Sequence, residues 1–201
     1  MLKKIFLFYF LFWTFGTTLI SSALNAGEYF YDGKQSQVSF SLKHLGIITV
    51  SGRFKTFSGS FQFDPGKIQD TTVNIHIGTA SVDSRMKTRD KHLRSKKFFW
   101  SEKHPEIHFK SHAVKDIRGM KFKVYGNLTI RGITKPAIFE TEFLSKENDA
   151  RADRPIHFRA HTHIKRKDFK LGTGDWFDPI STVTDETLRI NLEIKGLPKT
   201  S

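Results

Sequence analysis

Residues 188–194 read Leu-Arg-Ile-Asn-Leu-Glu-Ile, so apolar and polar side chains alternate at every step. Successive side chains of a β-strand point to opposite faces, and this alternation predicts a strand with one buried and one solvated face. An antiparallel sheet that covers a core on one side requires such a pattern. The stretch therefore indicates an all-β protein.

The same alternation recurs along the chain, over residues 38–42, 73–77, 122–128 and 156–160. Turn-forming residues separate the runs, most clearly Asp64-Pro65-Gly66. Many short strands predict a sandwich or a barrel, and about eight strands close into a barrel wide enough for one small ligand. Composition alone leaves the choice between these two architectures open.

One stretch breaks the strand pattern. Residues Ser84–Ser95 (SRMKTRDKHLRS) contain good helix formers and neither glycine nor proline, and Met86, Asp90 and Leu93 fall at helical spacing. We expect a short helix here, inserted between strands. Phe98-Phe99-Trp100 follows, and adjacent aromatic side chains cannot all point the same way in a strand. We expect this triplet in an irregular segment that closes one end of the barrel.

Residues 1–26 have the pattern of a secretory signal peptide. Lys3 and Lys4 give a positive start, an apolar run follows to Phe15, and small residues lead to Ala26. Cleavage after Ala23 or after Ala26 fits this pattern, and we favour Ala26, which leaves residues 27–201 as one β-barrel domain. The rival interpretation is an uncleaved membrane anchor, but the apolar core is shorter than the roughly 20 residues that span a bilayer.

The charge balance is basic, and the chain has no cysteine. Without Lys3 and Lys4, the 33 Lys and Arg residues fall to 31, against 20 Asp and Glu residues, a net charge of +11. A basic surface attracts anionic partners such as a membrane surface, but these residues are spread along the chain, and we interpret them as a solvated surface. No zinc-finger, helix-turn-helix or RNA-binding signature accompanies them, so we expect no nucleic-acid partner. The lack of cysteine excludes disulfides, cysteine nucleophiles and thiolate metal sites.

Six motifs, in order, resemble those of the YceI-like family. They are Ser36-x-x-x-Phe40 with Lys43–Gly46, Gly52–Asp64 (GRFKTFSGSFQFD), Arg89–Phe99 (RDKHLRSKKFF), Pro105–Ser111 (PEIHFKS), Gly126–Pro136 (GNLTIRGITKP) and Arg166–Phe169 (RKDF). The third is the most specific, and the resemblance runs from about Gly27 to Leu197. One departure is Lys170, which stands where the family usually has glycine.

The resemblance implies a lipocalin-like, eight-stranded antiparallel β-barrel with a short α-helix inserted between strands. Members of the family are typically exported to the bacterial periplasm. Some hold a polyisoprenoid chain, such as a quinone tail, or a fatty amide in the barrel. We therefore expect a periplasmic protein, with secretion beyond the outer membrane as the alternative, and no cofactor other than a bound isoprenoid-type lipid.

Phenylalanine dominates the positions that strand parity turns inward. Its ring supplies a large apolar area without a polar atom to satisfy, so a tunnel lined in this way favours an alkyl or isoprenoid chain. The residues expected to line the tunnel are Phe40, Leu42, Phe54, Phe61, Phe63, Ile75, Phe109, Phe122, Val124, Leu128, Phe143, Phe158, Leu188 and Ile190. The alternative is that these side chains fill the core, as happens in many small barrels. The sequence does not show the volume of the barrel interior. The family resemblance favours a hollow barrel.

Three polar residues are candidates for contacts with the polar head of a ligand: His44, His92 and Arg94. His44 has inward parity at the end of a strand, and the other two belong to the helix motif. The alternative is a buried, hydrogen-bonded lock between helix and barrel, which we favour for Arg89 and Asp90.

The remaining histidines predict no metal site. His161 and His163 lie two apart on a predicted strand and form an outer cationic row with His157 and Arg159. A metal site needs three or four ligands, and spacing places no third ligand beside them. No Gly-x-Ser-x-Gly elbow, phosphate loop or dinucleotide fingerprint is present, so we predict no catalytic residues.

Three hypotheses for function remain. The leading one is a lipid-binding protein that holds a long apolar ligand in the barrel for transport or storage. The second is an enzyme acting on an isoprenoid, quinone or acyl lipid at the tunnel mouth. The third is an interaction protein that docks through its basic surface. Association into a homodimer is compatible with all three.

Overall fold

The computed structural model describes residues 27–44, 48–145, 154–172 and 187–199. The predicted signal peptide, residues 1–26, lies outside the described residues, as do positions 146–153 of the predicted polar loop. Within the described part of the chain, no helix is long and apolar enough to cross a membrane.

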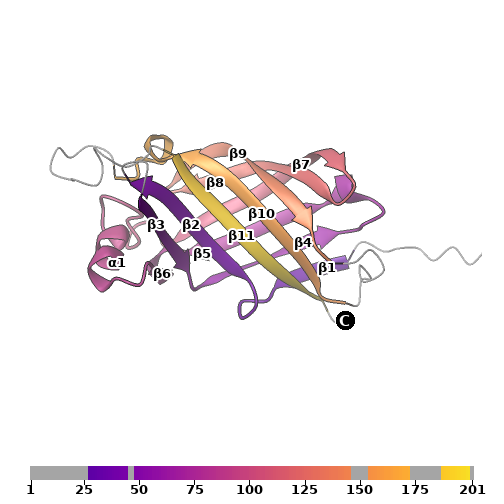
Figure 1. Cartoon of the computed structure of the whole chain (residues 1–201), viewed down its shortest axis with the longest axis horizontal. Helices are drawn as coiled ribbons and strands as arrows, with labels where there is room; N and C mark the ends of the chain where they lie inside the picture. The colour runs from indigo at the N-terminus through magenta and orange to yellow at the C-terminus, as the bar shows by residue number, and fades with distance from the viewer. Residues whose placement is uncertain (1–26, 45–47, 146–153, 173–186, 200–201) are drawn as a thin grey trace, which may run out of the picture.

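Eleven strands and one α-helix make up most of the described chain (Figure 1). The strands are β1 (Gly27–Tyr31), β2 (Gln37–His44), β3 (Ile48–Phe54), β4 (Phe57–Phe63), β5 (Thr72–Gly78), β6 (Val82–Asp83), β7 (Glu106–Arg118), β8 (Lys121–Ile130), β9 (Ile133–Phe143), β10 (Ile156–Lys165) and β11 (Thr187–Pro198). The helix is α1 (Lys87–Arg94), and short 3₁₀ turns lie at Ile68–Asp70, Thr79–Ser81 and Arg166–Phe169.

The strands close into an eight-stranded antiparallel barrel, as predicted. β11 pairs with β2 through Arg189–Glu193 and with β1 through Gly196–Pro198, so β1 and β2 act as one bent barrel strand. β3 pairs with β2 and β4 pairs with β1, so β3 and β4 form a second bent barrel strand. β6 pairs with β3 and β5 pairs with β4, so β5 and β6 form a third. The pairing of β1 with β11 completes the ring. A closed ring excludes the sandwich, because a sandwich keeps two separate sheets.

Side-chain hydroxyls hold the bends. Ser36, the first residue of the first motif, lies between β1 and β2. Its Oγ accepts a hydrogen bond from the Lys195 backbone N at 2.8 Å and donates to the Lys195 carbonyl oxygen at 3.1 Å. Ser81 Oγ accepts from the Thr56 backbone N at 3.0 Å between β3 and β4. At each bend, a hydrogen bond to a serine hydroxyl thus takes the place of a backbone hydrogen bond between paired strands.

The barrel has two distinct ends. At the helix end, on the left of Figure 1, α1 lies beside β3 and β6, while β1 and the C-terminal part of β11 lie at the opposite end. At this opposite end Phe63 packs against Phe143 and Phe158, with ring centroids 4.8 Å apart in both pairs. The predicted turn Asp64-Pro65-Gly66 also lies there, and Asp64 Oδ1 accepts from the Gly66 backbone N at 2.8 Å.

The helix is shorter than predicted. We expected Ser84–Ser95, whereas α1 spans Lys87–Arg94. The error has a local cause: Arg85 has φ of 62°, outside the helical range, and the Ser84 backbone N donates to the Asp90 carboxylate. A serine that bonds a side chain ahead of the first turn marks the start of a helix and not its interior.

The aromatic triplet lies in an irregular segment at the helix end, as predicted. Phe98 and Phe99 are buried, and Trp100 has φ of 51°. The Phe99 ring lies 5.3 Å from that of Phe54 and 6.2 Å from that of Phe40, measured between centroids. Phe99 therefore caps the barrel interior at this end.

Candidate functional site

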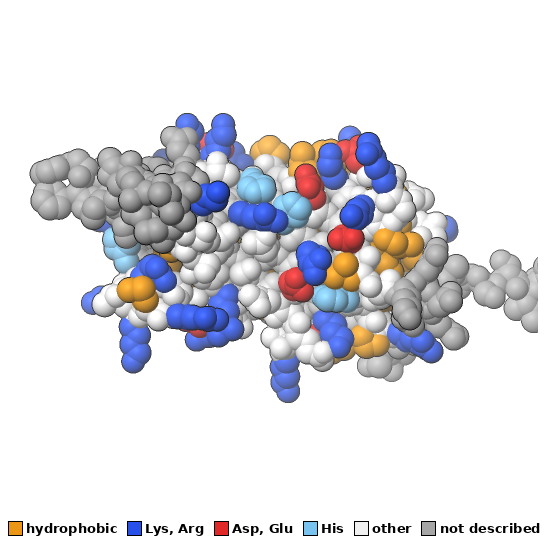
Figure 2. Space-filling model, viewed as in Figure 1, with side chains coloured by type: hydrophobic (Ala, Val, Ile, Leu, Met, Phe, Trp, Pro, Cys, Tyr) orange, Lys and Arg blue, Asp and Glu red, His pale blue; other side chains and the backbone are white. Residues whose placement is uncertain are grey.

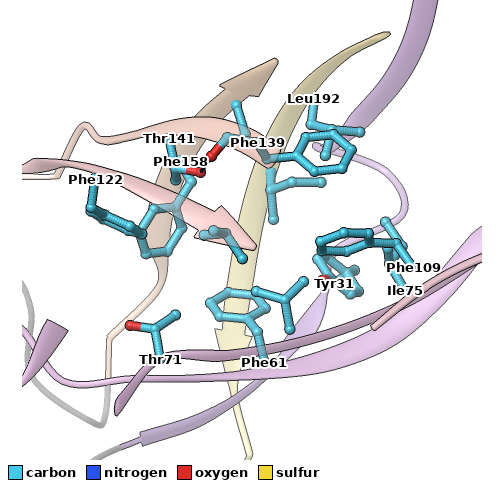
Figure 3. A pocket seen from close by; sticks show the side chains of 14 residues that line it. Tyr31, Phe61, Thr71, Ile75, Phe109, Phe122, Phe139, Thr141, Phe158 and Leu192 are labelled. Atoms are coloured by element: carbon cyan, nitrogen blue, oxygen red, sulfur yellow. Dashed lines mark hydrogen bonds between the residues drawn. The ribbon is translucent and has the colours of Figure 1, made fainter. Parts of the chain in front are cut away.

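The barrel interior contains two small apolar cavities. The larger has a volume of about 60 Å³ and is drawn in Figure 3; the second has about 30 Å³. Four residues line both cavities: Ile75, Phe109, Phe139 and Leu192. The two spaces therefore share a wall, and the interior is mostly filled by its own side chains. The expectation of a hollow barrel is wrong for the side-chain positions described here.

Most residues predicted to line a tunnel lie on these cavities. The larger cavity is bordered by Phe61, Ile75, Phe109, Phe122, Val124 and Phe158, and the smaller by Phe40, Phe54, Ile75, Phe109, Leu128, Leu188 and Ile190. Leu42 lies elsewhere, in a groove at the helix end. Phe63 and Phe143 are buried but border neither cavity, because they pack against each other at the opposite end.

Several cavity residues were missed by the sequence interpretation. Phe139, Ala160, Leu192 and Ile194 border the larger cavity. All four are buried and have the inward parity of their strands. Leu192 and Ile194 belong to the same alternating run as Leu188 and Ile190, so the signal for them was present although they were not included among the expected tunnel residues.

Glycines make room for the large rings. A Cβ atom at Gly126 would lie 2.5 Å from Phe109 Cζ, and one at Gly52 would lie 2.5 Å from Phe40 Cζ. These contacts are too short for any side chain. The tip of each ring thus lies against the backbone of a neighbouring strand, which allows phenylalanine to be used so densely inside a narrow barrel.

Polar groups at the larger cavity are hydroxyls without charge. Thr141 Oγ1 donates to the Phe139 carbonyl oxygen at 3.2 Å. Thr71 is 7% exposed, and its Oγ1 has no hydrogen-bond partner in the described structure. Burial raises the pKa of the Tyr31 phenol above its ordinary value, so this group stays neutral. The interior therefore suits an apolar chain with at most one or two polar atoms.

A wider groove of about 260 Å³, which we call the mouth groove, lies at the helix end between α1 and the β2–β3 hairpin. Its lining is Phe40, Leu42, Val50, Ser51, Ser84, Arg89, His92, Leu93, Phe98 and Arg166. Phe40 also borders the smaller cavity. The apolar spaces therefore follow one another, from the larger cavity through the smaller one to the mouth groove.

Arg89 and Asp90 form the predicted lock. Asp90 Oδ1 accepts from the Ser84 backbone N at 2.7 Å and from Ser84 Oγ at 2.5 Å. Arg89 Nε donates to Ser84 Oγ at 2.8 Å, and Arg89 Nη2 donates to the Ser84 carbonyl oxygen at 2.7 Å. Both side chains thus tie α1 to the segment before it. The guanidinium of Arg89 also borders the mouth groove.

The three predicted head-group residues have different positions. His92 borders the mouth groove, and its ring lies 4.8 Å from that of Phe98. Arg94 does not border it: Arg94 Nη1 donates to the carbonyl oxygens of Ala80 and Val82, both at 3.2 Å, so this side chain braces α1. His44 is the last residue of β2, but its side chain lies outside the described structure.

Arg166 is a mouth-groove residue that we did not predict as a site. It is 7% exposed, and its guanidinium carbon lies 5.8 Å from the centre of the Phe98 ring. The 3₁₀ turn that carries it is held by Arg131, which donates to the carbonyl oxygens of Lys170 and Lys96. Lys170 has φ of 53°, a left-handed conformation that glycine adopts without steric cost. The RKDF motif marked this turn, but only the fold places it at the mouth.

The outer row on β10 is solvated, as predicted, and several of its side chains are paired with carboxylates, which the sequence did not predict. Glu193 lies 3.1 Å from Arg159 Nε and 3.6 Å from His157 Nε2, and Glu140 lies 3.3 Å from His161 Nε2. Among the described residues, no group of three or more His, Cys, Asp or Glu side chains could hold a metal ion. Lys and Arg side chains are scattered over the visible face and do not form one block (Figure 2).

Comparison with known proteins gives one consistent family. A model of the YceI-like domain matches residues 29–196. A UPF0312 protein of Vibrio campbellii is 39% identical over 159 residues, which cover 77% of this chain and 84% of that protein. A UPF0312 protein of Photorhabdus laumondii is 42% identical over 153 residues, covering 75% of this chain and 79% of that protein.

Solved structures show the same barrel. BcnA of Burkholderia cenocepacia superimposes with a TM-score of 0.73 at 27% identity, covering 82% of this chain and 98% of that one. The YceI protein of Campylobacter jejuni gives a TM-score of 0.65 at 29% identity, with 79% and 90% coverage. A polyisoprenoid-binding domain from Saccharophagus degradans gives 0.63 with 87% and 99% coverage; at 14% identity this likeness concerns the fold alone.

Proposed function

The chain belongs to the YceI-like family, and from that premise we propose that it is a lipid-binding protein that holds a long apolar chain along the barrel axis, for transport or storage. One observation carries the proposal: apolar spaces follow one another from the larger cavity to the mouth groove, with shared walls at Phe109 and Phe40. A neighbour with this fold is a polyisoprenoid-binding domain, which agrees with a chain-shaped ligand.

The spaces must widen to admit such a ligand. Pockets for small molecules usually have about 300–1,000 Å³, whereas the two internal cavities have about 60 and 30 Å³. Rotation of rings such as Phe40, Phe99 and Phe109 would join these cavities to the mouth groove. A chain that buries about 300 Å² of apolar surface gains about 7.5 kcal/mol, which exceeds the 0.5–1.5 kcal/mol for each strained rotamer.

The interior favours the tail of the ligand and discriminates little between tails. Its walls are aliphatic and aromatic, and Tyr31, Thr71 and Thr141 provide the hydroxyls. A polyisoprenoid, a quinone tail and a fatty amide all satisfy these conditions, and we propose that the ligand belongs to this group. The predicted signal peptide supports a periplasmic location, where such a carrier would shield a lipid from water.

Native mass spectrometry of the protein, purified without detergent and then extracted with organic solvent, tests the proposal. A bound mass of a few hundred daltons that is released as a prenyl or acyl lipid is the expected result. The same protein is next incubated with geranylgeraniol, a neutral prenyl alcohol. A protein that carries no lipid on purification and also fails to take up geranylgeraniol would refute the proposed function.

An enzyme at the mouth remains the alternative from the sequence, and the described mouth groove offers guanidinium groups, an imidazole and two serines for it. Ser84 is already engaged by Asp90 and Arg89. Neither the groove nor the family comparison points to a reaction, so binding is the function that these observations support best.

A further inference from the structure

Several segments meet at the helix end of the barrel and form one surface there. They are α1 with the irregular segment after it, the β8–β9 turn and the turn after β10 (Figure 1). Hydrogen bonds join them, because Arg131 in the β8–β9 turn donates to the carbonyl oxygens of Lys96 and Lys170. We call this surface the basic face, and it comprises residues 85–104, 131–135 and 165–170.

Cations outnumber carboxylates on the basic face. Residues 85–104 contain eight Lys and Arg residues and two acidic ones, residues 165–170 contain four and one, and residues 131–135 contain two and none. Of the three acidic residues, Asp90 is buried and accepts hydrogen bonds from Ser84. Residues 173–186, which lie outside the described residues, contain four acidic residues, and subtracting them leaves the excess positive.

Charges at the opposite end nearly balance. Three carboxylates there are paired with lysines: Glu28 lies 2.8 Å from Lys199 Nζ, Asp116 lies 2.8 Å from Lys123 Nζ, and Glu142 lies 3.5 Å from Lys121 Nζ. The turn after β4 adds Asp64 and Asp70 against Lys67. The scattered cations on the face in Figure 2 thus conceal a difference in charge between the two ends of the barrel.

Trp100 is held at the surface of the basic face. Its φ of 51° is a left-handed conformation that is rare for a bulky residue. Its backbone N donates to the Ser95 carbonyl oxygen at 2.9 Å, and its carbonyl oxygen accepts from the backbone N of Lys103 and of His104 at 3.0 and 2.8 Å. The ring is partly exposed and is not part of the hydrophobic core. A strained residue fixed in this way, outside the core, points to a role at the surface.

Tryptophan beside lysine favours a membrane surface as the partner. Tryptophan settles at the level of lipid headgroups, because its ring is apolar while its indole N–H needs an acceptor. Lys and Arg side chains are attracted to anionic lipids at short range. Met86, which is 52% exposed just before α1, adds an apolar side chain to the same face.

Single-stranded nucleic acid fits the same face less well. Bases bind proteins by stacking on aromatic rings, whereas lysines lie over the ring of Trp100. Lys96 Nζ lies 5.2 Å and Lys103 Nζ lies 4.6 Å from its centre. These ammonium groups compete with a base for the ring, and they are well placed to meet lipid phosphates around it.

We propose that the basic face docks on the anionic surface of a lipid bilayer, with Trp100 at the level of the headgroups. The mouth groove opens on this face, since Arg89, His92 and Arg166 belong to both. Docking therefore turns the mouth groove towards the membrane, where long apolar ligands reside. The purpose of docking rests on the proposed function, whereas docking itself is measured without a ligand.

Sedimentation with vesicles tests the proposal. The protein is purified after export from a bacterial host, and its mass confirms that the predicted signal peptide has been removed. It is then mixed with vesicles of phosphatidylcholine alone, or of phosphatidylcholine and phosphatidylglycerol in equal parts. The protein should sediment with the anionic vesicles and not with the neutral ones, and this association should weaken steeply as salt rises.

Matched variants locate the docking surface. Lys96→Gln with Lys103→Gln removes the two exposed charges beside Trp100. Each lysine near an anionic surface contributes about fivefold, so the double variant should bind roughly 30-fold more weakly. Lys67→Gln with Arg118→Gln removes two exposed charges from the opposite end. This control should bind the anionic vesicles like the unmodified protein.

Fluorescence reports the position of Trp100 itself. Trp176→Phe leaves Trp100 as the single tryptophan after the predicted signal peptide. Its emission should shift to shorter wavelength when anionic vesicles are added, because the ring enters a less polar environment. Heparin, a soluble polyanion, should cause no such shift.

Three results would overturn the proposal: equal binding to neutral and anionic vesicles, an equal loss in both double variants, or binding to heparin as tight as to vesicles without a shift of Trp100 emission. The last result would identify the basic face as a site for soluble polyanions. A protein that takes up geranylgeraniol but ignores anionic vesicles keeps the proposed function and loses the docking surface. One that docks but takes up no geranylgeraniol keeps the docking surface and loses the proposed function.

Discussion

The larger cavity permits a test in which stability and binding change in opposite directions. Ala160 lies on β10 between Thr141 on β9 and Leu192 on β11, and it borders the cavity of about 60 Å³. Ala160→Val adds two methyl groups at this point. An unfilled cavity costs about 24 cal/mol per Å³, which gives about 1.4 kcal/mol for 60 Å³. The variant should therefore raise the free energy of unfolding by up to about 1.4 kcal/mol.

The same substitution should weaken lipid binding under the proposed function. Two added methyl groups take the space of about two methylene groups of the ligand. Each buried methylene contributes about 0.8 kcal/mol, so the affinity for geranylgeraniol should fall by about 1.6 kcal/mol, or roughly 15-fold. Urea unfolding measures the first effect, and isothermal titration with geranylgeraniol measures the second.

Ala137→Val is the matched control. Ala137 is a buried alanine on β9 that borders neither cavity, so the added methyl groups enter packed space. Overpacking of this kind usually destabilises by about 1–3 kcal/mol, and the affinity for geranylgeraniol should stay unchanged. If Ala160→Val binds geranylgeraniol as tightly as the unmodified protein, the cavity is not part of the lipid path. If it unfolds as easily as Ala137→Val, the cavity is not available space.

Three further predictions concern the frame around the site. Asp90→Ala leaves the Ser84 backbone N and Oγ without their acceptor and should lower the free energy of unfolding by about 1–3 kcal/mol, measured in urea with exposed Glu102→Ala as the control. Hydrogen bonds from Lys55 and from the Arg85 backbone N lower the pKa of Asp83 from 3.8 to about 2. The ion pairs of Asp83 therefore stabilise the fold above about pH 4, and this contribution is lost as the pH falls through 2. Asp83→Asn should accordingly reduce the loss of stability at acid pH, measured as the free energy of unfolding against pH. Gly126→Ala forces a Cβ against Phe109 and should destabilise by about 1–3 kcal/mol, whereas Gly33→Ala, where a Cβ meets no atom within 4 Å, should be nearly neutral in the same thermal melt.

The sequence predicted the strands well because alternation reports which face of a strand is buried, whereas the choice of a barrel over a sandwich followed from the family resemblance. The run from Leu188 to Ile194 forms part of β11, with Leu188, Leu192 and Ile194 buried, as the pattern requires. Alternation says nothing about height along the barrel axis. For that reason Phe63 and Phe143 received the same prediction as Phe109, although they pack at the far end and Phe109 borders both cavities.

The candidate site was less predictable, because it depends on volume and on contacts between distant segments. Whether Phe40 fills the barrel or lines an open tunnel depends on ring orientation over Gly52, which a pattern of residues does not record. Arg166 reaches the mouth only because Arg131 holds the turn after β10 against the segment after α1. Arg89 was predicted as a lock, and the structure adds that the same guanidinium borders the mouth groove.

A filled interior and a chain-shaped ligand are compatible for an energetic reason. Turning one ring away from its preferred rotamer costs about 0.5–1.5 kcal/mol, and the burial of about two methylene groups offsets that cost. The gain grows with every methylene that enters, whereas the cost arises only at rings that block the path, such as Phe40 and Phe99 at the helix end. A compact ligand would have to displace several rings at once for the same buried area. The interior therefore favours a thin, flexible chain.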